Sequence, residues 1–375
     1  MKKRIAALVC VAALMACCAI AFSACSGKQV AATVNGTEIY EETITSDVEA
    51  FRKSYSLEDE DSWGEWMANY GYTPSTVREA MIDSYVETEL IKQAAKENDV
   101  SADSSEVDSY LQQMKANYSS DEAWNNALTS AGFTEETYKE RIEESLLEQA
   151  LMDKVTPLTD PDESTMLTYA QMYNSYYDGA KRSSHILFNA GDEATAQSVL
   201  DQINAGTLSF EDAAKQYSQD TGSASNGGDV GWDMLNSFVS EYTDALDGLS
   251  EGQVSGLVTS DYGIHIIKCT EVYTAPETLE SVDQMPEAFR ESIKETVQSY
   301  TQQNDFSTWL SDYEEQQNIV INDMPSGLSY DVDMSKYENT NDNSNSNSTN
   351  TNTSTNTNNE ATNENSNTNN TNSNS

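Results

Sequence analysis

Residues 263–268 read GIHIIK, and the histidine within this apolar run is the starting point for interpreting the chain. The sequence of 375 residues contains one other histidine, His185, in the stretch SSHILF (183–188). Short apolar runs of this kind are typical of buried strands. One such histidine alone is best explained as a hydrogen-bonded core residue. Two of them, with none elsewhere in the chain, favour a paired site.

Two familiar kinds of histidine site fit this sequence poorly. A zinc site needs three or four ligands at tight spacing, and the chain has neither an H-E-x-x-H nor a Cys-x-x-Cys motif. A Ser-His-Asp hydrolase with a nucleophile elbow would carry G-x-S-x-G, which is also missing. We therefore expect no metal and no cofactor at the paired histidines.

The charge balance argues against nucleic acid as a partner. The chain has 63 acidic and 20 basic residues, a formal net charge of −43. Phosphate backbones are bound by basic surfaces, so we expect no nucleic-acid partner. The hydrophobic content of 37% is enough for one or two buried cores.

The N-terminus predicts export and lipid attachment. Three basic residues at positions 2–4 precede an apolar run, 5–22, and small residues then lead to Cys25 in FSACSGK. This pattern resembles a bacterial lipoprotein signal, which implies removal of residues 1–24 and a lipid on Cys25. An uncleaved membrane span is the alternative, because 18 apolar residues could cross a bilayer. Cleavage before Cys17 would truncate the apolar run.

Helical patterns on both sides of a mixed segment predict an interrupted domain. VAATVNGTEIY (30–40) alternates like a strand with an Asn-Gly turn, and helical periodicity follows to about residue 180. It returns over 285–317, before the short strand NIVIN (318–322). Short strands and helices alternate between 181 and 273, which predicts an α+β module. We expect this module to interrupt one helical domain, in which ATVNG and NIVIN pair.

The last residues, from about Tyr337, are almost wholly Asn, Ser, Thr and Glu, and such a composition cannot build a core. The predicted boundaries are therefore a signal peptide at 1–24, an N-terminal helical part at 25–180, the α+β module at 181–273, a C-terminal helix and strand at 274–325, and a disordered polar tail at 326–375.

The module carries a family resemblance spread over several segments. SSHILF, FEDAAKQYSQD (210–220), SNGGDVGW (225–232) and LDGLSEGQVSGLVTSDYGIHIIK (246–268) together resemble, in order and spacing, the parvulin peptidyl-prolyl isomerases. The lipoprotein signal, VNGTEI (34–39) and the helical arms resemble the PrsA-type extracellular foldases. The helical parts are also similar to the chaperone SurA.

The resemblance implies an active site and a proline pocket. The site would contain four catalytic residues in one network, His185, Asp220, Ser260 and His265. The substrate-binding pocket would be lined by Val230, Phe238 and Tyr242, where the family usually has Leu, Met and Phe. Tyr242 is therefore expected to bring a hydroxyl into an apolar pocket. Asp233 replaces the aromatic residue usual after GW, and Gly227 and Gly228 are expected to form a tight entry to the strand DVGW.

The implied function is isomerisation of Xaa-Pro bonds in unfolded or newly secreted polypeptides, together with holdase activity. The protein would act at the extracytoplasmic face of the cell membrane. The sequence leaves open whether it forms a homodimer. The acidic loop NAGDEA (189–194) predicts independence from substrate phosphate. Two alternatives remain: a non-catalytic chaperone with a degenerate parvulin module, and a solute-binding or adhesion lipoprotein. The second leaves the ordered motifs unexplained.

Overall fold

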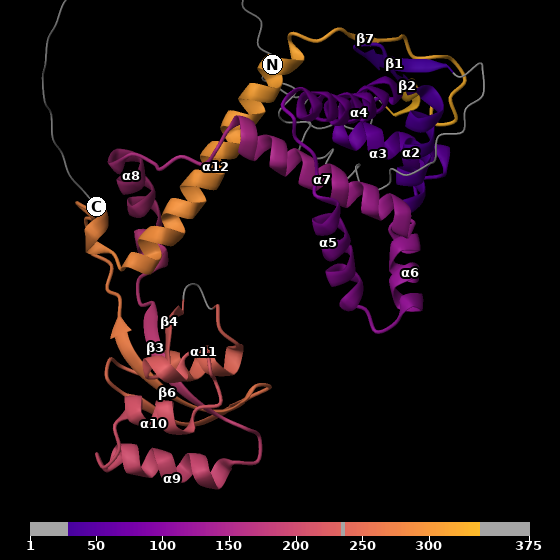
Figure 1. Ribbon diagram of the computed structural model, residues 1–375. Helices are drawn as coiled ribbons and strands as arrows, with labels where there is room; N and C mark the ends of the chain where they lie inside the picture. The colour runs from indigo at the N-terminus through magenta and orange to yellow at the C-terminus, as the bar shows by residue number, and fades with distance from the viewer. Residues whose placement is uncertain (1–28, 234–236, 338–375) are drawn as a thin grey trace, which may run out of the picture.

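A computed structural model describes residues 29–233 and 237–337, which form a helical domain, a long helix and a smaller α+β module (Figure 1). The predicted signal peptide, Cys25 and the polar sequence after residue 337 lie outside the described residues. Within the described ranges, no helix combines the length and the apolar character needed to cross a membrane.

A three-stranded sheet, in the order β2-β1-β7, joins the two ends of the helical domain. β1 (Val30–Val34) and β2 (Thr37–Tyr40) form a hairpin that turns at Asn35 and Gly36, both at positive φ. β7 (Ile319–Ile321) pairs antiparallel with β1, and Val34 lies opposite Ile319. The predicted pairing of these distant strands is confirmed. The helical segments before and after the module therefore share one domain.

The segments with helical periodicity, up to about residue 180 and over 285–317, do form the helices of this domain. α7 starts with a capping box between Thr134 and Thr137 and ends before Pro157. The helical pattern predicted to about residue 180 ends earlier: α8 stops at Tyr173 and a 3-10 turn follows over 174–176. In this turn the Asn174 side chain donates to the linker carbonyl of Pro276. The helices are α2 (Glu41–Ser54), α3 (Glu60–Tyr70), α4 (Pro74–Glu97), α5 (Ser104–Ala116), α6 (Asp121–Ser130), α7 (Glu135–Val155), α8 (Glu163–Tyr173) and α12 (Glu287–Glu314).

The segment 326–337 packs on the helical domain, so the predicted tail boundary at 326 is wrong for these residues. Tyr330 is fully buried in the core formed by α2, α3 and α4, and its carbonyl accepts a hydrogen bond from the Trp63 indole at 3.0 Å. The ring of Tyr337 covers Gly64 so closely that a Cβ there would lie 2.1 Å from it. Aromatic anchors separated by polar residues hold this segment, and its overall polarity hides them in the sequence.

The α+β module is a four-stranded antiparallel sheet in the order β4-β3-β6-β5, with helices on both faces (Figure 1). Alternate residues of β3 and β6 point to opposite faces. Ile186 and Ile266 pack against α9 and α10, whereas Ile267 and Cys269 pack against α11. The elements are β3 (Lys181–Phe188), α9 (Glu193–Asn204), α10 (Phe210–Tyr217), β4 (Asp229–Asp233), α11 (Ser240–Asp247), β5 (Val254–Ser260) and β6 (Gly263–Val272).

One phenylalanine of α12 packs against residues of the α+β module and so connects it to the helical domain. Phe289 is fully buried and stacks on Tyr177 with ring centroids 4.3 Å apart. Tyr273 at the end of β6 and Trp232 on β4 meet the same ring edge-on, at 5.3 and 4.9 Å. At 28 residues, α12 is roughly 42 Å long, and its other end packs through Phe306 against α4 and α7.

Candidate active site

The two histidines lie side by side on the α11 face of the sheet. His185 of β3 is opposite Ile267 and His265 of β6 is opposite Leu187, so the two are diagonal neighbours on adjacent strands. Their rings stack with centroids 5.3 Å apart, and the two Nδ1 atoms are separated by 3.2 Å. Both are buried, at 8% and 4% exposure. The paired arrangement predicted from the two apolar runs is present.

A hydrogen-bonded chain extends from the histidine pair in both directions. His185 Nε2 lies 2.8 Å from Asp220 Oδ2, and His265 Nε2 lies 2.8 Å from Ser260 Oγ. The loop after α10 fixes Asp220, which accepts hydrogen bonds from the Ser223 hydroxyl and the Gly222 backbone N–H. The structure thus brings together all four residues that the sequence assigns to the network.

The surroundings of the chain set its charge state. The hydrogen bond from Ser223, reinforced by those from His185 and Gly222, lowers the pKa of Asp220 to about 2. Burial, followed by the neighbouring His185, lowers the pKa of His265 to about 4. At neutral pH Asp220 is therefore a carboxylate and His265 is a neutral imidazole.

These charge states limit where the protons can lie. His185 Nε2–H donates to the Asp220 carboxylate. With a neutral His185, its bare Nδ1 accepts from the Nδ1–H of His265, and the Nε2 of His265 accepts from the Ser260 hydroxyl. Every group then has a partner, and the donors all point from Ser260 toward Asp220. Protonation of His185 would reverse the direction of the bonds at His265 and Ser260.

The three predicted pocket residues gather beside the pair. Tyr242 is buried at 4% exposure, and its ring lies edge-on to both imidazoles, at centroid distances of 5.8 and 5.5 Å. Phe238 packs edge-on against Tyr242 at 5.0 Å. Phe238 and Val230 are both half-buried members of this cluster. An apolar wall therefore stands next to a polar network, as a proline ring and its adjoining amide would require.

The hydroxyl of Tyr242 does not lie where the sequence suggests. The substitution for the family's phenylalanine predicts a hydroxyl inside the apolar pocket. The hydroxyl instead pairs with Ser183 Oγ at 3.0 Å, and Ser183 is fully buried. Burial raises the pKa of Tyr242, so this group stays protonated. The partner belongs to β3 beyond a register shift between Arg182 and Ser183, which the sequence does not reveal.

The glycine-rich stretch serves the backbone, as predicted. Gly228 has φ +82°, and a Cβ at this position would lie 2.2 Å from the carbonyl oxygen of His185. The Gly228 carbonyl accepts the His185 N–H at 2.8 Å. The loop can thus press against the histidine strand only because it has no side chain there.

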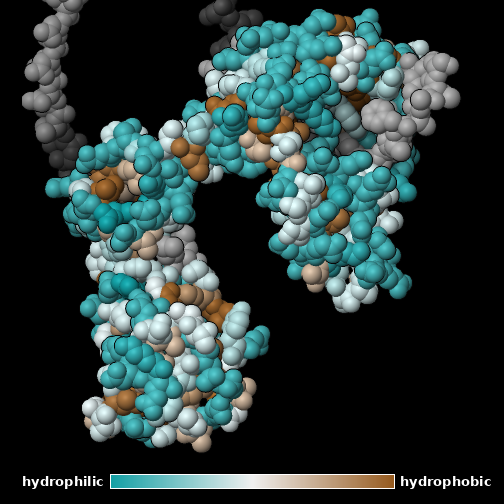
Figure 2. Space-filling view, in the orientation of Figure 1, coloured by the Kyte–Doolittle hydropathy of each residue, from teal (hydrophilic) through white to brown (hydrophobic). Residues whose placement is uncertain are grey.

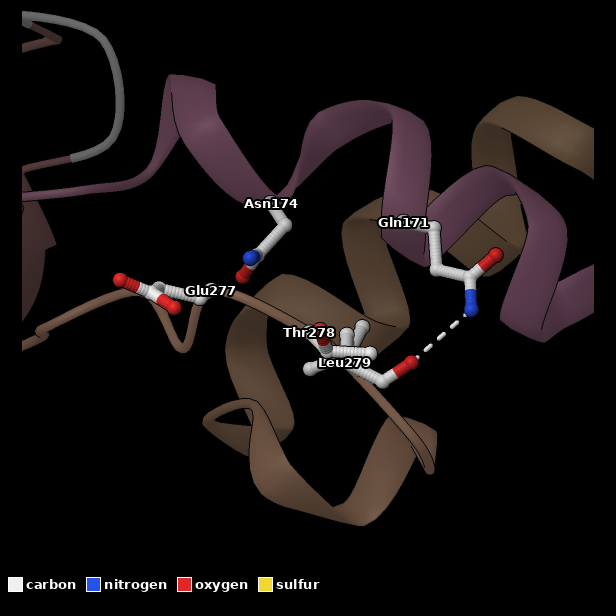
Figure 3. A pocket seen from close by; sticks show the side chains of 5 residues that line it. All are labelled: Gln171, Asn174, Glu277, Thr278 and Leu279. Carbon is white, nitrogen blue, oxygen red and sulfur yellow. Dashed lines mark hydrogen bonds between the residues drawn. The ribbon is translucent and has the colours of Figure 1, made fainter.

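A cavity of about 230 Å³ lies elsewhere, where the linker after β6 crosses α8 (Figure 3). Gln171 donates to the carbonyl of Leu279 at 2.9 Å, and Asn174 donates to that of Pro276. Asn174 also accepts from the Tyr273 hydroxyl at 2.7 Å. These side chains are occupied in holding the linker, so the histidine pair is the stronger candidate site.

Comparison with known families agrees with this placement. Residues 185–271, which contain the whole network and pocket, match the PPIC-type peptidyl-prolyl isomerase domain. The chain carries a PPIC-type isomerase domain. Residues 1–152 match the SurA-like N-terminal domain. The predicted fold, an isomerase domain inserted in a SurA-like helical domain, is confirmed.

Several curated relatives are named foldase proteins. The chain is 48% identical over 99 residues to the foldase protein PrsA of Geobacillus kaustophilus, covering 26% of this chain and 34% of that protein. It is 28% identical over 306 residues to PrsA of Caldanaerobacter subterraneus, covering 80% and 89%. The chain thus spans about a third of the length of the first curated relatives that it matches. A crystal structure of PrsA from Bacillus subtilis is 21% identical, covering 79% of this chain and 95% of that one, with a TM-score of 0.37.

Proposed function

We propose that the protein is a lipid-anchored, extracytoplasmic foldase that isomerises Xaa-Pro bonds in secreted polypeptides and holds unfolded segments on its helical domain. The observation that carries the proposal is the chain Ser260–His265–His185–Asp220 beside the apolar cluster of Val230, Phe238 and Tyr242. Its location inside the matched isomerase domain supports it.

The chemistry asked of this site is rotation about one bond. Amide resonance opposes the rotation with a barrier of about 18–20 kcal/mol. In the twisted transition state the amide loses that resonance, and its carbonyl carries less negative charge than in either planar form. The apolar wall grips the proline ring, and the dry surroundings of the amide favour its less polar, twisted form. The neutral, buried His265 keeps this wall free of a positive charge that would stabilise the planar amide.

The polar network has a positioning task in this proposal. Asp220 and Ser260 hold the two imidazoles from opposite ends, so the rings keep a fixed orientation beside the bound amide. The acidic loop after β3, in which Asn189 contacts Asp192, offers no cation to a phosphate. Substrates with and without a phosphate next to the proline should therefore react alike, or the phosphorylated one more slowly.

The holdase part of the proposal concerns the helical arms. Figure 2 shows a broad hollow between the isomerase domain and the hairpin of α5 and α6, on a mainly hydrophilic face. A polypeptide segment passing through this hollow would reach both domains. A non-catalytic chaperone, in which the isomerase domain only holds proline-containing segments, is the alternative.

An exchange measurement separates the two functions. The full-length protein is added to short Xaa-Pro peptides, and cis–trans exchange is followed by NMR beside suppression of aggregation of an unfolded client. Asp220→Ala should lower the exchange efficiency about tenfold or more, because it leaves His185 without its partner, and it should spare aggregation suppression. Asp192→Asn, an exposed carboxylate on the loop after β3, is the matched control. Wild-type protein that suppresses aggregation without accelerating exchange would establish the chaperone alternative.

The anchor is tested separately. A fatty-acid analogue fed to expressing cells should label the wild-type protein and not Cys25→Ser. Label retained in Cys25→Ser would place the lipid on another cysteine of the N-terminal sequence.

A further inference from the structure

Asp233, the last residue of β4, is a buried carboxylate with no role in the histidine network. It is 8% exposed. Its Oδ1 accepts the backbone N–H of Ser237 at 2.7 Å and that of Phe238 at 3.3 Å. Its Oδ2 accepts the Thr243 hydroxyl at 2.8 Å. One side chain therefore connects the end of β4 to the residues that precede α11 and to the first turn of that helix.

The C-terminal end of α11 is held by Lys181 of β3, the residue opposite Asp233 in the sheet. The Lys181 ammonium donates to the carbonyls of Leu246 and Asp247 at 3.1 and 2.6 Å, and to Leu249 at 2.9 Å. A carboxylate thus sits at the start of the helix and an ammonium at its end, which is the favourable arrangement at both termini.

The helix held in this way carries the wall of the proposed proline pocket. Phe238, whose N–H is bound by Asp233, packs against Tyr242, and Tyr242 faces both imidazoles. Moving the start of α11 would move this wall relative to His185 and His265 while leaving the network itself intact. The contacts of Asp233 thus act on the apolar side of the site alone.

We propose that Asp233 is a positioning residue of the isomerase site, which sets the distance between the pocket wall of Phe238 and Tyr242 and the histidine pair. This inference rests on the proposed function. The ligand it serves is the proline ring of an Xaa-Pro segment. Loss of the contact should weaken the binding of that ring in ground state and transition state alike, so KM changes and kcat does not.

The test compares four variants of the full-length protein by NMR titration with one Xaa-Pro peptide, giving KM and the exchange rate at saturation. Asp233→Ala should raise KM about tenfold, with kcat kept within about twofold. Asp233→Asn should restore most of the affinity, because its amide oxygen accepts both N–H groups and its NH₂ can donate to Thr243. Thr243→Val should shift KM in the same direction by less. Asp244→Asn removes an exposed charge from the same helix and should change neither constant.

The outcomes separate this inference from the proposed function. Unchanged KM in Asp233→Ala, or a fall in kcat at constant KM, would overturn the positioning role. If Asp233→Ala does not fold, the KM of Thr243→Val tests the positioning role. A KM equal to that of the wild type would then contradict it. If wild-type protein accelerates no exchange, the proposed function fails and the peptide dissociation constant takes the place of KM. A tenfold weaker complex of Asp233→Ala would still support positioning, and equal binding, or no binding by the wild type, would refute it.

Discussion

His265 is the more deeply buried member of the histidine pair, and its environment links the site to acidity. An exposed histidine protonates near pH 6.5, whereas burial and the neighbouring His185 lower the pKa of His265 to about 4. Between these two values the unfolded chain binds a proton that the folded chain excludes. Folding is therefore weakened as the pH falls from 6.5 toward 4.

We predict that this loss is local to the isomerase domain and disappears in His265→Gln. Each unit between the folded and unfolded pKa corresponds to about 1.4 kcal/mol. Hydrogen exchange of the β3 and β6 amides, corrected for the intrinsic pH dependence, measures the free energy of opening from pH 7 to 4. Asp220 acts in a lower window, because its pKa of about 2 lies below the usual 3.8, so its contribution is lost only below about pH 3.8. Equal slopes in wild type and His265→Gln would contradict the assignment.

Tyr242 gives a second prediction at this scale. The sequence alone predicts that Tyr242→Phe keeps or raises activity by restoring an apolar pocket. Because the hydroxyl binds the buried Ser183, we expect the substitution to act on stability. It should cost about 1–3 kcal/mol of the free energy of unfolding, since Ser183 loses its partner.

Ser183→Ala combined with Tyr242→Phe should recover much of that loss, since both polar groups are then absent. Exchange activity per folded molecule should be unchanged in all three variants, because the ring contacts remain. Urea unfolding of the set measures the stabilities, and a Tyr242→Phe protein as stable as wild type would contradict the pairing.

Most of the proposed network could be predicted from the sequence, and its supporting contacts could not. His185, Asp220, Ser260 and His265 stand in the motifs that resemble the parvulins, and this resemblance implies their place in the network. Ser183 and Asp233 bind partners 59 and 10 residues away, and the strand register and helix placement that create these contacts leave no mark in the local pattern. Asp233 was visible only as a departure from the family's aromatic residue.

The same division holds for secondary-structure elements. The periodicity of 285–317 predicts α12 to within three residues at each end, and Phe289 as part of its apolar face. It does not predict that Tyr177, Trp232 and Tyr273 converge on Phe289. Tyr176 and Tyr177, just after α8, illustrate the difficulty, because Tyr177 is buried and Tyr176 is 66% exposed. Periodicity assigns a face to a helix, whereas its partner depends on the chain topology.

At the scale of elements, Phe289→Ala should loosen the isomerase domain from α12. Removing a fully buried phenylalanine costs about 3–5 kcal/mol, and three aromatic contacts are lost with it. We expect a lower melting temperature and a broader distribution of distances between labels on α9 and α5. Tyr300→Ala, at a position 58% exposed on the same helix, should leave both measurements unchanged. A Phe289→Ala protein with the wild-type distance distribution would show that the domains are held elsewhere.

At the scale of the whole molecule, the inserted domain should be removable. The chain enters and leaves it side by side, since Gly179 donates to the Tyr273 carbonyl and Tyr273 donates to that of Ala180. The sequence suggests excision of 181–273. The structure argues for keeping Tyr273, because its hydroxyl binds Asn174 and its ring covers Phe289.

We predict that replacing 181–272 by a short glycine-containing turn leaves a helical protein that unfolds in one cooperative transition. The cores shared by α4, α7 and α12 and the β1–β7 pairing remain. This shortened protein lacks the contact of the Trp232 ring with Phe289, so its helical domain should be less stable than that of the full chain. Calorimetry measures the transition, and a non-cooperative profile from a soluble, helical product would contradict the single-domain assignment.

The pairing of β1 with β7 also determines the order in which the two domains fold, when the chain leaves the ribosome or the membrane from its N-terminus. Asn322 binds the Val30 carbonyl across 292 positions, whereas Arg182 and Glu271 meet across 89. The later part of the chain can thus become complete first, since its contacts are nearer in sequence. A nascent chain that has exposed residues up to about 280 should hold a protease-resistant isomerase domain beside a protease-sensitive N-terminal half. The isomerase domain would then be folded before β7 pairs with β1 and completes the helical domain.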